Sequence, residues 1–444
     1  MPGDLRPGGK THDSGKTTDG MANTATASAK GAPSINTIVM AGGLILALSF
    51  GARSMFGGIV EPISNDLFGG AIEIISLSIA IQNLVWGLAQ PVFGMVADRY
   101  GDRRALAIGL CCYLAGLGVC IVGTTPLAQH LGAGLLVGMG ISGTAFGVVL
   151  AVIGRAAPEE KRALYLGIAS ALGSVGQVVM PLMASWLTAW LDWRMTLAVI
   201  TVMLAPMALC IPRLRADAGP SAGGGMGRAG GDDTPPLRQT VTQAFRHPSF
   251  LFLTAGFFVC GFHLAFITAH LPNYVQNFCI GTGMSPGELR AFGLRALSVV
   301  GFANIIGTLL ATHLGTLFPK PYVLAAIYAL RTLVILVFIS QPLTPLSIMV
   351  FAFAMGVLWL STVPLTSALV LTMFGPRPMG TLFGFVFLGH QLGGFIGVWL
   401  AGAWFDIYAN YDVVWHASVA LGAVSALLHS LVKERGAGPA LHHA

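Results

Sequence analysis

Hydrophobic residues in this chain gather into long runs that short polar segments separate. Twelve of these runs hold about 20 residues each, and a helix of that length crosses the ~30 Å hydrocarbon layer of a membrane. Helices satisfy their own backbone polar groups in hydrocarbon, so the pattern predicts an all-α membrane protein with twelve transmembrane helices. The predicted spans are residues 37–60, 72–97, 103–123, 128–154, 163–190, 194–212, 249–278, 290–314, 321–340, 345–373, 379–405 and 412–432.

Composition agrees with this pattern, because 55% of the residues are hydrophobic and only 9% are charged, whereas a soluble domain carries about 25% charged residues. The six cysteines lie in or beside the apolar runs without the spacing of a metal site, so we interpret them as packing residues. The chain contains no G-x-S-x-G, HExxH or phosphate-loop motif. We therefore expect neither an enzyme nor a cofactor or metal site.

Basic residues divide the connections between spans into two classes. Nineteen of the 24 Lys and Arg lie in the even-numbered connections and the two tails, and this bias marks cytoplasmic segments. The odd-numbered connections carry mainly acids, with Arg194 and Arg290 as exceptions. We predict a multi-pass protein of the cell membrane, such as a bacterial inner membrane, with both termini cytoplasmic. The net charge of +6 then reflects topology and contact with anionic lipid, and no basic and aromatic stripe indicates nucleic-acid binding.

The polar segments also suggest a domain plan. Residues 1–34 are polar and read as a disordered cytoplasmic tail, in which Met1 or Met21 is the true start. Glycine, proline and charge then mark residues 213–248 as a cytoplasmic linker, with Leu237, Val241 and Phe245 indicating either a helix on the inner membrane surface or plain linker. The predicted domains are a first six-helix bundle (35–212), a second (249–432) and a cytoplasmic tail (433–444).

The two predicted bundles show weak internal similarity. Residues 162–177 match 379–394 at an offset of 217, which pairs Gly176 with Gly393, and residues 61–68 match 271–278 at an offset of 210. Helix 5 thus repeats as helix 11 and helix 1 as helix 7. Repeats of this kind form transporters with a binding site near the membrane midplane between the two halves.

The loop between the second and third spans reads "GMVADRYGDRRAL" (94–106). Its glycines permit a tight turn, and its arginines can engage phosphates or helix ends. The loop resembles the G-x-x-x-D-R-x-G-x-R-R signature of the major facilitator superfamily, which implies a fold of two pseudo-symmetric six-helix bundles around a central cavity. The resemblance implies a conformational latch in which Asp98 contacts the start of helix 11 and a base at the end of helix 4. The latch residues are Gly94, Asp98, Arg99, Gly101, Arg103, Arg104 and Arg155.

The rest of the chain is similar to the monocarboxylate porters and oxalate/formate antiporters of that superfamily. The resemblance places a base in the outer part of helix 1 and an acid eight residues later, where this chain has Arg53 and Glu61. It also implies an Asp and an Arg in helix 8, where this chain has Asn304 and Thr308. Because the Asp and Arg are replaced, the resemblance does not imply the family's coupling mechanism for this chain.

Arg53 is the strongest candidate for a substrate-binding residue. A guanidinium in hydrocarbon costs several kcal/mol unless it is paired or lines a wet cavity, and its planar fork suits a carboxylate. A purely structural arginine is the alternative. At the offset of 210, His263 occupies the equivalent place in helix 7, so the two are predicted to face each other, with His390 as a second titratable donor. Either histidine also fits as hydrogen-bonded packing.

No Asp or Glu lies deep within any run, although a cation site normally needs one, so the remaining polar groups favour a small organic anion. We expect Arg295 to guide the anion and Arg331 to be structural. The candidate substrate-binding residues are Arg53, Asn83, Gln177, His263, Arg295, Asn304, His390 and Gln391.

The predicted function is secondary active transport of a mono- or dicarboxylate by a monomer, with a proton or in exchange. A coupled proton would travel on a histidine or on the substrate carboxylate. Export of amphipathic compounds or drugs is the alternative within transport. A membrane sensor that does not transport is a further alternative, although the chain offers no signalling domain.

Overall fold

The computed structural model describes residues 33–158, 161–214, 237–375 and 378–434. These residues include twelve helices that are long and apolar enough to cross a membrane. The twelve spans confirm the predicted ones, with ends that differ by a few residues, as the first runs from Ile35 to Gly58 and the last from Asp412 to Ser430.

Several spans consist of more than one helical piece, because the backbone departs from the α-helical pattern within them. Helix 1 breaks after Ser54 and helix 10 after Val357. The helices are α2 (Ile35–Ser54), α3 (Val60–Leu67), α4 (Ile72–Tyr100), α5 (Asp102–Val122), α6 (Pro126–Gln129), α7 (Val137–Thr144), α8 (Phe146–Ala156), α9 (Arg162–Leu187), α10 (Trp193–Leu204), α11 (Met207–Cys210), α12 (Leu237–Arg246), α13 (Pro248–Phe278), α14 (Pro286–Leu317), α15 (Lys320–Ile339), α16 (Pro345–Val357), α17 (Thr362–Phe374), α18 (Met379–Tyr408) and α19 (Asp412–Ser430).

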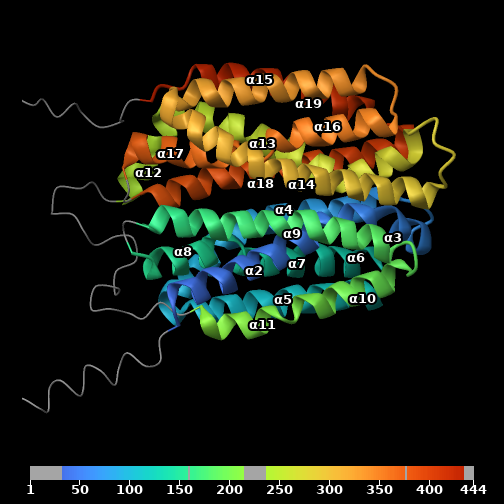
Figure 1. Cartoon of the computed structure of the whole chain (residues 1–444), viewed down its shortest axis with the longest axis horizontal. Coiled ribbons are helices and arrows are strands. Elements are labelled where there is room, and N and C mark those ends of the chain that lie inside the picture. The colour runs from blue at the N-terminus through green and yellow to red at the C-terminus, as the bar shows by residue number, and fades with distance from the viewer. Residues whose placement is uncertain (1–32, 159–160, 215–236, 376–377, 435–444) are drawn as a thin grey trace, which may run out of the picture.

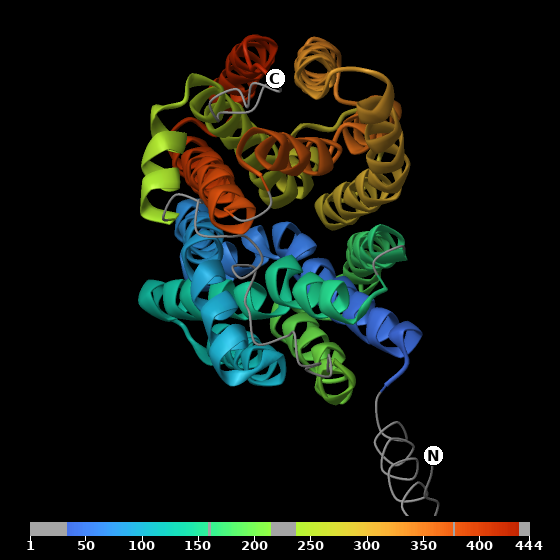
Figure 2. The ribbon, with the colours of Figure 1, turned by 90° about the vertical axis from the view of Figure 1, so that its left-hand side faces the viewer.

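The helices form two bundles, which confirms the predicted fold class. Helices α2 to α11 make one bundle, and α13 to α19 make the other (Figures 1 and 2). The bundles meet mainly where α4 packs along α18 and where α9 packs along α14. We call the end at which α2 begins and α19 ends the terminal end, on the left of Figure 1, and the other the opposite end.

The internal repeat is visible in the way the helices pack. A Cβ atom at Gly176 in α9 would overlap the carbonyl oxygen of Ala47 in α2, and one at Gly393 in α18 would overlap that of Phe258 in α13. These pairs are related by offsets of 217 and 211 residues, close to those found in the sequence. Helices 5 and 11 therefore pack on helices 1 and 7 through equivalent glycines, as expected for pseudo-symmetric halves.

Local sequence explains where several helices begin at the opposite end. Thr125, Ser285 and Thr344 each precede a proline, and each hydroxyl accepts a hydrogen bond from the third residue of its helix. Hydroxyl side chains cap helix starts, and proline suits the first turn because its missing N–H would have no helical partner.

The segment between the bundles is only partly described, since residues 215–236 of the predicted linker lie outside the described residues. Helix α12 follows, which confirms the helix indicated by the spacing of Val241 and Phe245. The ring of Phe245 packs against Phe250 in α13 and Phe385 in α18, with centroid distances of 5.6 and 5.2 Å. Helix α12 is thereby tied to the second bundle.

Candidate functional site

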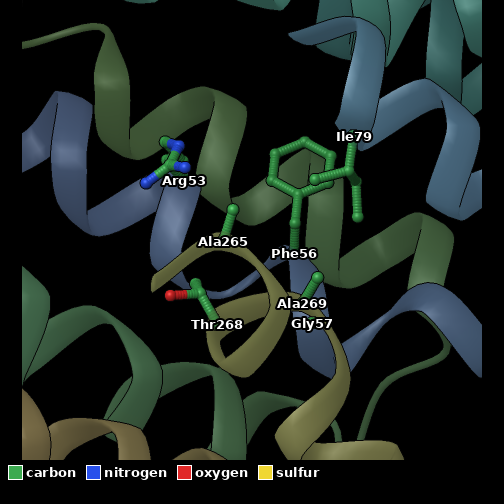
Figure 3. A pocket seen from close by; sticks show the side chains of 7 residues that line it. All are labelled: Arg53, Phe56, Gly57, Ile79, Ala265, Thr268 and Ala269. Carbon is green, nitrogen blue, oxygen red and sulfur yellow. The ribbon is translucent and has the colours of Figure 1, made fainter. Parts of the chain in front are cut away.

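Arg53 lies in the last turn of α2, directly before the break in helix 1. The chain continues there as a 3₁₀ turn (Phe56–Gly58) before α3 begins. Arg53 borders a cavity of about 10 Å³ that α2, the 3₁₀ turn, α4 and α13 enclose (Figure 3). That volume holds about one water molecule. The other lining residues are Phe56, Gly57, Ile79, Ala265, Thr268 and Ala269.

The guanidinium of Arg53 has polar and aromatic neighbours on α4. Its Nη2 donates a hydrogen bond to Oδ1 of Asn83 at 2.6 Å, and its Cζ lies 5.1 Å from the ring centroid of Trp86. Asn83 is held in this orientation because its Nδ2 donates to the carbonyl of Ile79 at 2.9 Å. The buried Nε of Arg53 has no hydrogen-bond partner, and none of the ion pairs among described residues includes Arg53.

Two contacts close the space between the bundles at the opposite end, beside Arg53. A Cβ at Gly57 would overlap the carbonyl oxygen of Thr268 in α13, so only glycine permits this approach. Further out, Gln276 in α13 donates to Glu61 in α3 at 2.6 Å, and Arg290 in α14 lies 3.5 Å from the same carboxylate. Glu61 thus joins the first bundle to the second.

A third contact at this end joins α18 to the start of α4. Both carboxylate oxygens of Asp406 accept hydrogen bonds from backbone amides, those of Ile72 at 2.9 Å and Glu73 at 2.7 Å. Ala71, at the N-cap position, has no side chain that can cap these amides. A carboxylate at a helix N-terminus is stabilising, so Asp406 caps α4 from the other bundle. This role was not predicted from the sequence, although the sequence shows that Ala71 lacks a capping side chain and that Asp406 is an acid at the same end of the molecule.

The two bases that break the charge pattern are both paired with acids. Arg290 contacts Glu61, and Arg194 forms an ion pair of 2.6 Å with Asp66, which also accepts from Nε1 of Trp193. The hydrogen bonds from Trp193 and Arg194 lower the pKa of Asp66 below its ordinary value.

The two candidate histidines point into the second bundle. The ring of His263 is fully buried, and its Nε2 lies 2.9 Å from the carbonyl of Ser418 in α19. The prediction that His263 faces Arg53 is therefore wrong, because the backbone carbonyl on α19 draws the ring to the far side of α13. His390 is stacked on Phe387 at 5.7 Å, and its Nδ1 has no partner among the described residues.

The remaining candidates lie where the bundles meet. Asn304 in α14 donates to Ser174 of α9 at 3.4 Å, while its Oδ1 accepts from the backbone of Leu360 at 2.9 Å. Nε of Arg295 donates to Ser185 of α9 at 3.3 Å. Two more candidates lie at the interface. The backbone of Gln177 packs against Gly301 of α14, and the buried side chain of Gln391 packs against Gly87 of α4.

Arg331 in α15 is fully buried within the second bundle. Its Nη2 donates to the backbone carbonyls of Leu358 and Trp359, which the break in helix 10 leaves without helical partners. Asn304 and Arg331 thus both bond to backbone groups in the break of helix 10. These contacts agree with the structural role expected for Arg331. Among the described residues, no group of three or more His, Cys, Asp or Glu is placed to hold a metal ion.

The motif loop lies at the terminal end, between α4 and α5. Gly101 has a φ of +93°, which favours glycine and makes the tight turn that the motif predicts. Arg103 donates to the carbonyl of Pro212 at 2.6 Å, and Arg155 pairs with Asp102. The expected partner of Arg155 was Asp98, so the base at the end of helix 4 engages the acid that begins α5. The side chain of Asp98 lies outside the described residues.

The other motif residues make fewer contacts in this conformation. The Cζ of Arg99 lies 5.4 Å from the ring centroid of Tyr100, and Arg104 is exposed. A Cβ at Gly94 would meet no neighbour within 4 Å in the part of the chain that the structure describes. Helix α4 is therefore loosely packed near Gly94.

The sequence and the fold are both similar to those of known transporters. The family model of the Major Facilitator Superfamily matches residues 42–398. An uncharacterized MFS-type transporter, YcxA, of Bacillus subtilis (strain 168) is 24% identical over 395 residues, which cover 85% of this chain and 90% of that protein. The class C tetracycline resistance protein of Escherichia coli is 32% identical over 138 residues, 30% of this chain and 34% of that protein. The crystal structure of a D-xylose-proton symporter superposes with a TM-score of 0.64 at 16% identity, over 90% of this chain and 99% of that one.

Proposed function

This chain belongs to the Major Facilitator Superfamily, and we propose that it carries a small organic anion, a mono- or dicarboxylate, across the cell membrane by alternating access. Arg53 is the observation that carries the proposal. It lies at the bundle interface within a membrane span, with an unsatisfied Nε and no ion pair among the described residues. An unpaired charge in such surroundings costs several kcal/mol, and a substrate carboxylate would supply the missing partner.

The contacts between the bundles support alternating access. The contacts of Glu61, Gly57 and Asp406 lie at the opposite end. Nearer the terminal end, an added Cβ at Gly94 or Gly384 would meet no neighbour within 4 Å among the described residues. We propose that this conformation is closed at the opposite end and that the bundles rock apart there to reach the alternate state. With the bases cytoplasmic, the opposite end faces outward, and the transporter acts as a monomer with a proton or in exchange.

Substitution of Arg53 tests the proposal. Arg53→Lys keeps the charge but loses the planar fork, so carboxylate binding should weaken about 10-fold. Arg53→Gln leaves a desolvated anion without a counter-charge and should weaken binding at least about 100-fold. The assay is transport into proteoliposomes and binding to purified protein, for a panel of mono- and dicarboxylates with and without a pH gradient.

Arg213→Gln is the matched control, because Arg213 is exposed at the terminal end and its described hydrogen bond goes to Leu209 of the same membrane span. Equal carboxylate affinity in Arg53→Gln and the parent would reject the proposal.

Export of an amphipathic or drug-like compound is the second candidate. The partial similarity to the tetracycline resistance protein favours it. Competition separates the two, because carboxylates should inhibit uptake by an anion carrier and should leave drug export unchanged.

A further inference from the structure

A line of aromatic rings runs past Arg53 from one bundle to the other. It begins on α8, passes through α2 and α4, crosses to α18 and ends on α13. Successive ring centroids lie 4.7, 5.8, 5.2, 5.7 and 4.9 Å apart. The rings, in order, are those of Phe146, Phe50, Trp86, Phe387, His390 and Phe257. Phe146 and Phe387 are only half-buried, so parts of their rings remain accessible.

Hydrogen-bond donors without partners lie along the same line. Nε of Arg53, Nε1 of Trp86 and both Nε2 and Oε1 of Gln391 are buried without a hydrogen-bond partner among the described residues. Arg53 lies over the ring of Trp86, and Gln391 packs against Gly87, the next residue of α4. A buried donor without an acceptor is unfavourable. We call this line of six rings the aromatic wall. It combines apolar ring faces with donors that an oxygen acceptor of a ligand could satisfy.

Among the described residues, Arg53 is the base whose guanidinium lies over a ring of the aromatic wall. Arg295 is exposed and donates to Ser185, and Nη2 of Arg331 donates to the carbonyls of Leu358 and Trp359 within the second bundle. A ligand with two carboxylates would bury one of them without a counter-charge, which is costly. The site therefore suits a single negative charge.

We infer that the substrate is a monocarboxylate with an aromatic body. Its carboxylate would lie on Arg53, and its ring would pack against Trp86 and Phe387, whose contact crosses the bundle interface. This inference rests on the proposed function and narrows it. Ring–ring contacts add about 2- to 10-fold in affinity beyond the burial of apolar area.

The test is calorimetric titration of the purified protein in nanodiscs at pH 7.5 with four probes of similar size. Benzoate should bind about 2- to 10-fold more tightly than cyclohexanecarboxylate. It should bind at least about 10-fold more tightly than the dianion phthalate, and the neutral benzamide should not bind.

Phe387→Leu should reduce the affinities for benzoate and cyclohexanecarboxylate to about the same value, because it removes the ring face that distinguishes the two ligands and leaves Arg53 over Trp86 unchanged. Phe385→Leu is the matched control, since that ring lies on the same helix but packs against Phe245 of α12.

The probes on the unaltered protein decide the inference even where a variant fails to fold. Equal binding of benzoate and cyclohexanecarboxylate, or of benzoate and phthalate, would overturn the aromatic monocarboxylate and leave the anion carrier standing, provided that binding still depends on Arg53. Failure of every carboxylate to bind would overturn both.

Discussion

The cap that Asp406 provides across the interface yields a prediction about the conformational equilibrium. Asp406→Asn removes the charge and one of the two acceptor oxygens at the start of α4. A hydrogen bond to a charged group contributes about 1.5–3 kcal/mol, and a charge at a helix end about 0.3–1 kcal/mol. Asp406 is exposed, and exposure weakens both effects. We therefore expect a loss of about 1–2 kcal/mol, which raises the population open at the opposite end about 5- to 30-fold.

Thiol labelling measures this shift. In a variant whose six native cysteines are replaced by serine, Thr268→Cys places one thiol in the cavity beside Arg53, behind the closed opposite end. A membrane-impermeant maleimide supplied from that side should react about 5- to 30-fold faster when Asp406→Asn is added.

Asp66→Asn is the control for this experiment, because Asp66 is an acid at the same end whose partners Trp193 and Arg194 belong to its own bundle. Equal labelling rates in the Asp406 variant, the Asp66 variant and the parent would refute the cap as a conformational latch.

Three further predictions concern closure, the motif loop and topology. Gly57→Ala should prevent closure at the opposite end and slow transport at least about 10-fold, whereas Gly118→Ala, which has open space around it, should not, as initial transport rates will show. Asp98→Asn should slow transport more than it weakens substrate binding, because the latch acts on the rocking step; transport at the parental rate would make Asp98 an ordinary loop charge. Cysteines at positions 14 and 221 should be labelled only from the cytoplasmic side, and labelling from outside intact cells would reverse the assigned topology.

The sequence was sufficient for the twelve spans because membrane helices are defined by length and hydrophobicity. Helix starts such as Thr125-Pro126 and Ser285-Pro286 carry a local signal, because their caps lie within three residues, although the predicted spans began at residues 128 and 290. The break in helix 10 has no comparable signal. It depends on Asn304 and Arg331, which arrive from helices 8 and 9 to bond its freed backbone groups.

Pairings of side chains between helices could not be predicted from residue types. Arg155 had two acids within reach of its predicted place, and the structure pairs it with Asp102. His263 was assigned to the interface by an offset along the sequence, and an offset fixes the depth of a residue in the membrane but not the direction in which its side chain points. The buried carbonyl of Ser418 decided that direction, because a buried polar ring requires a partner.

Asn304 shows how a departure from the family pattern acquires a physical meaning. The resemblance implies an acid at this place in helix 8, and an acid there would titrate and respond to a proton gradient. The amide does not titrate, and it bonds to Leu360 in the break of helix 10 and to Ser174 across the interface. An ionised carboxylate has no N–H to donate to Ser174. The amide can therefore bond to both bundles whatever the pH. If transport is coupled to a proton, position 304 does not carry that proton, and the substrate carboxylate is the carrier that the proposed function offers.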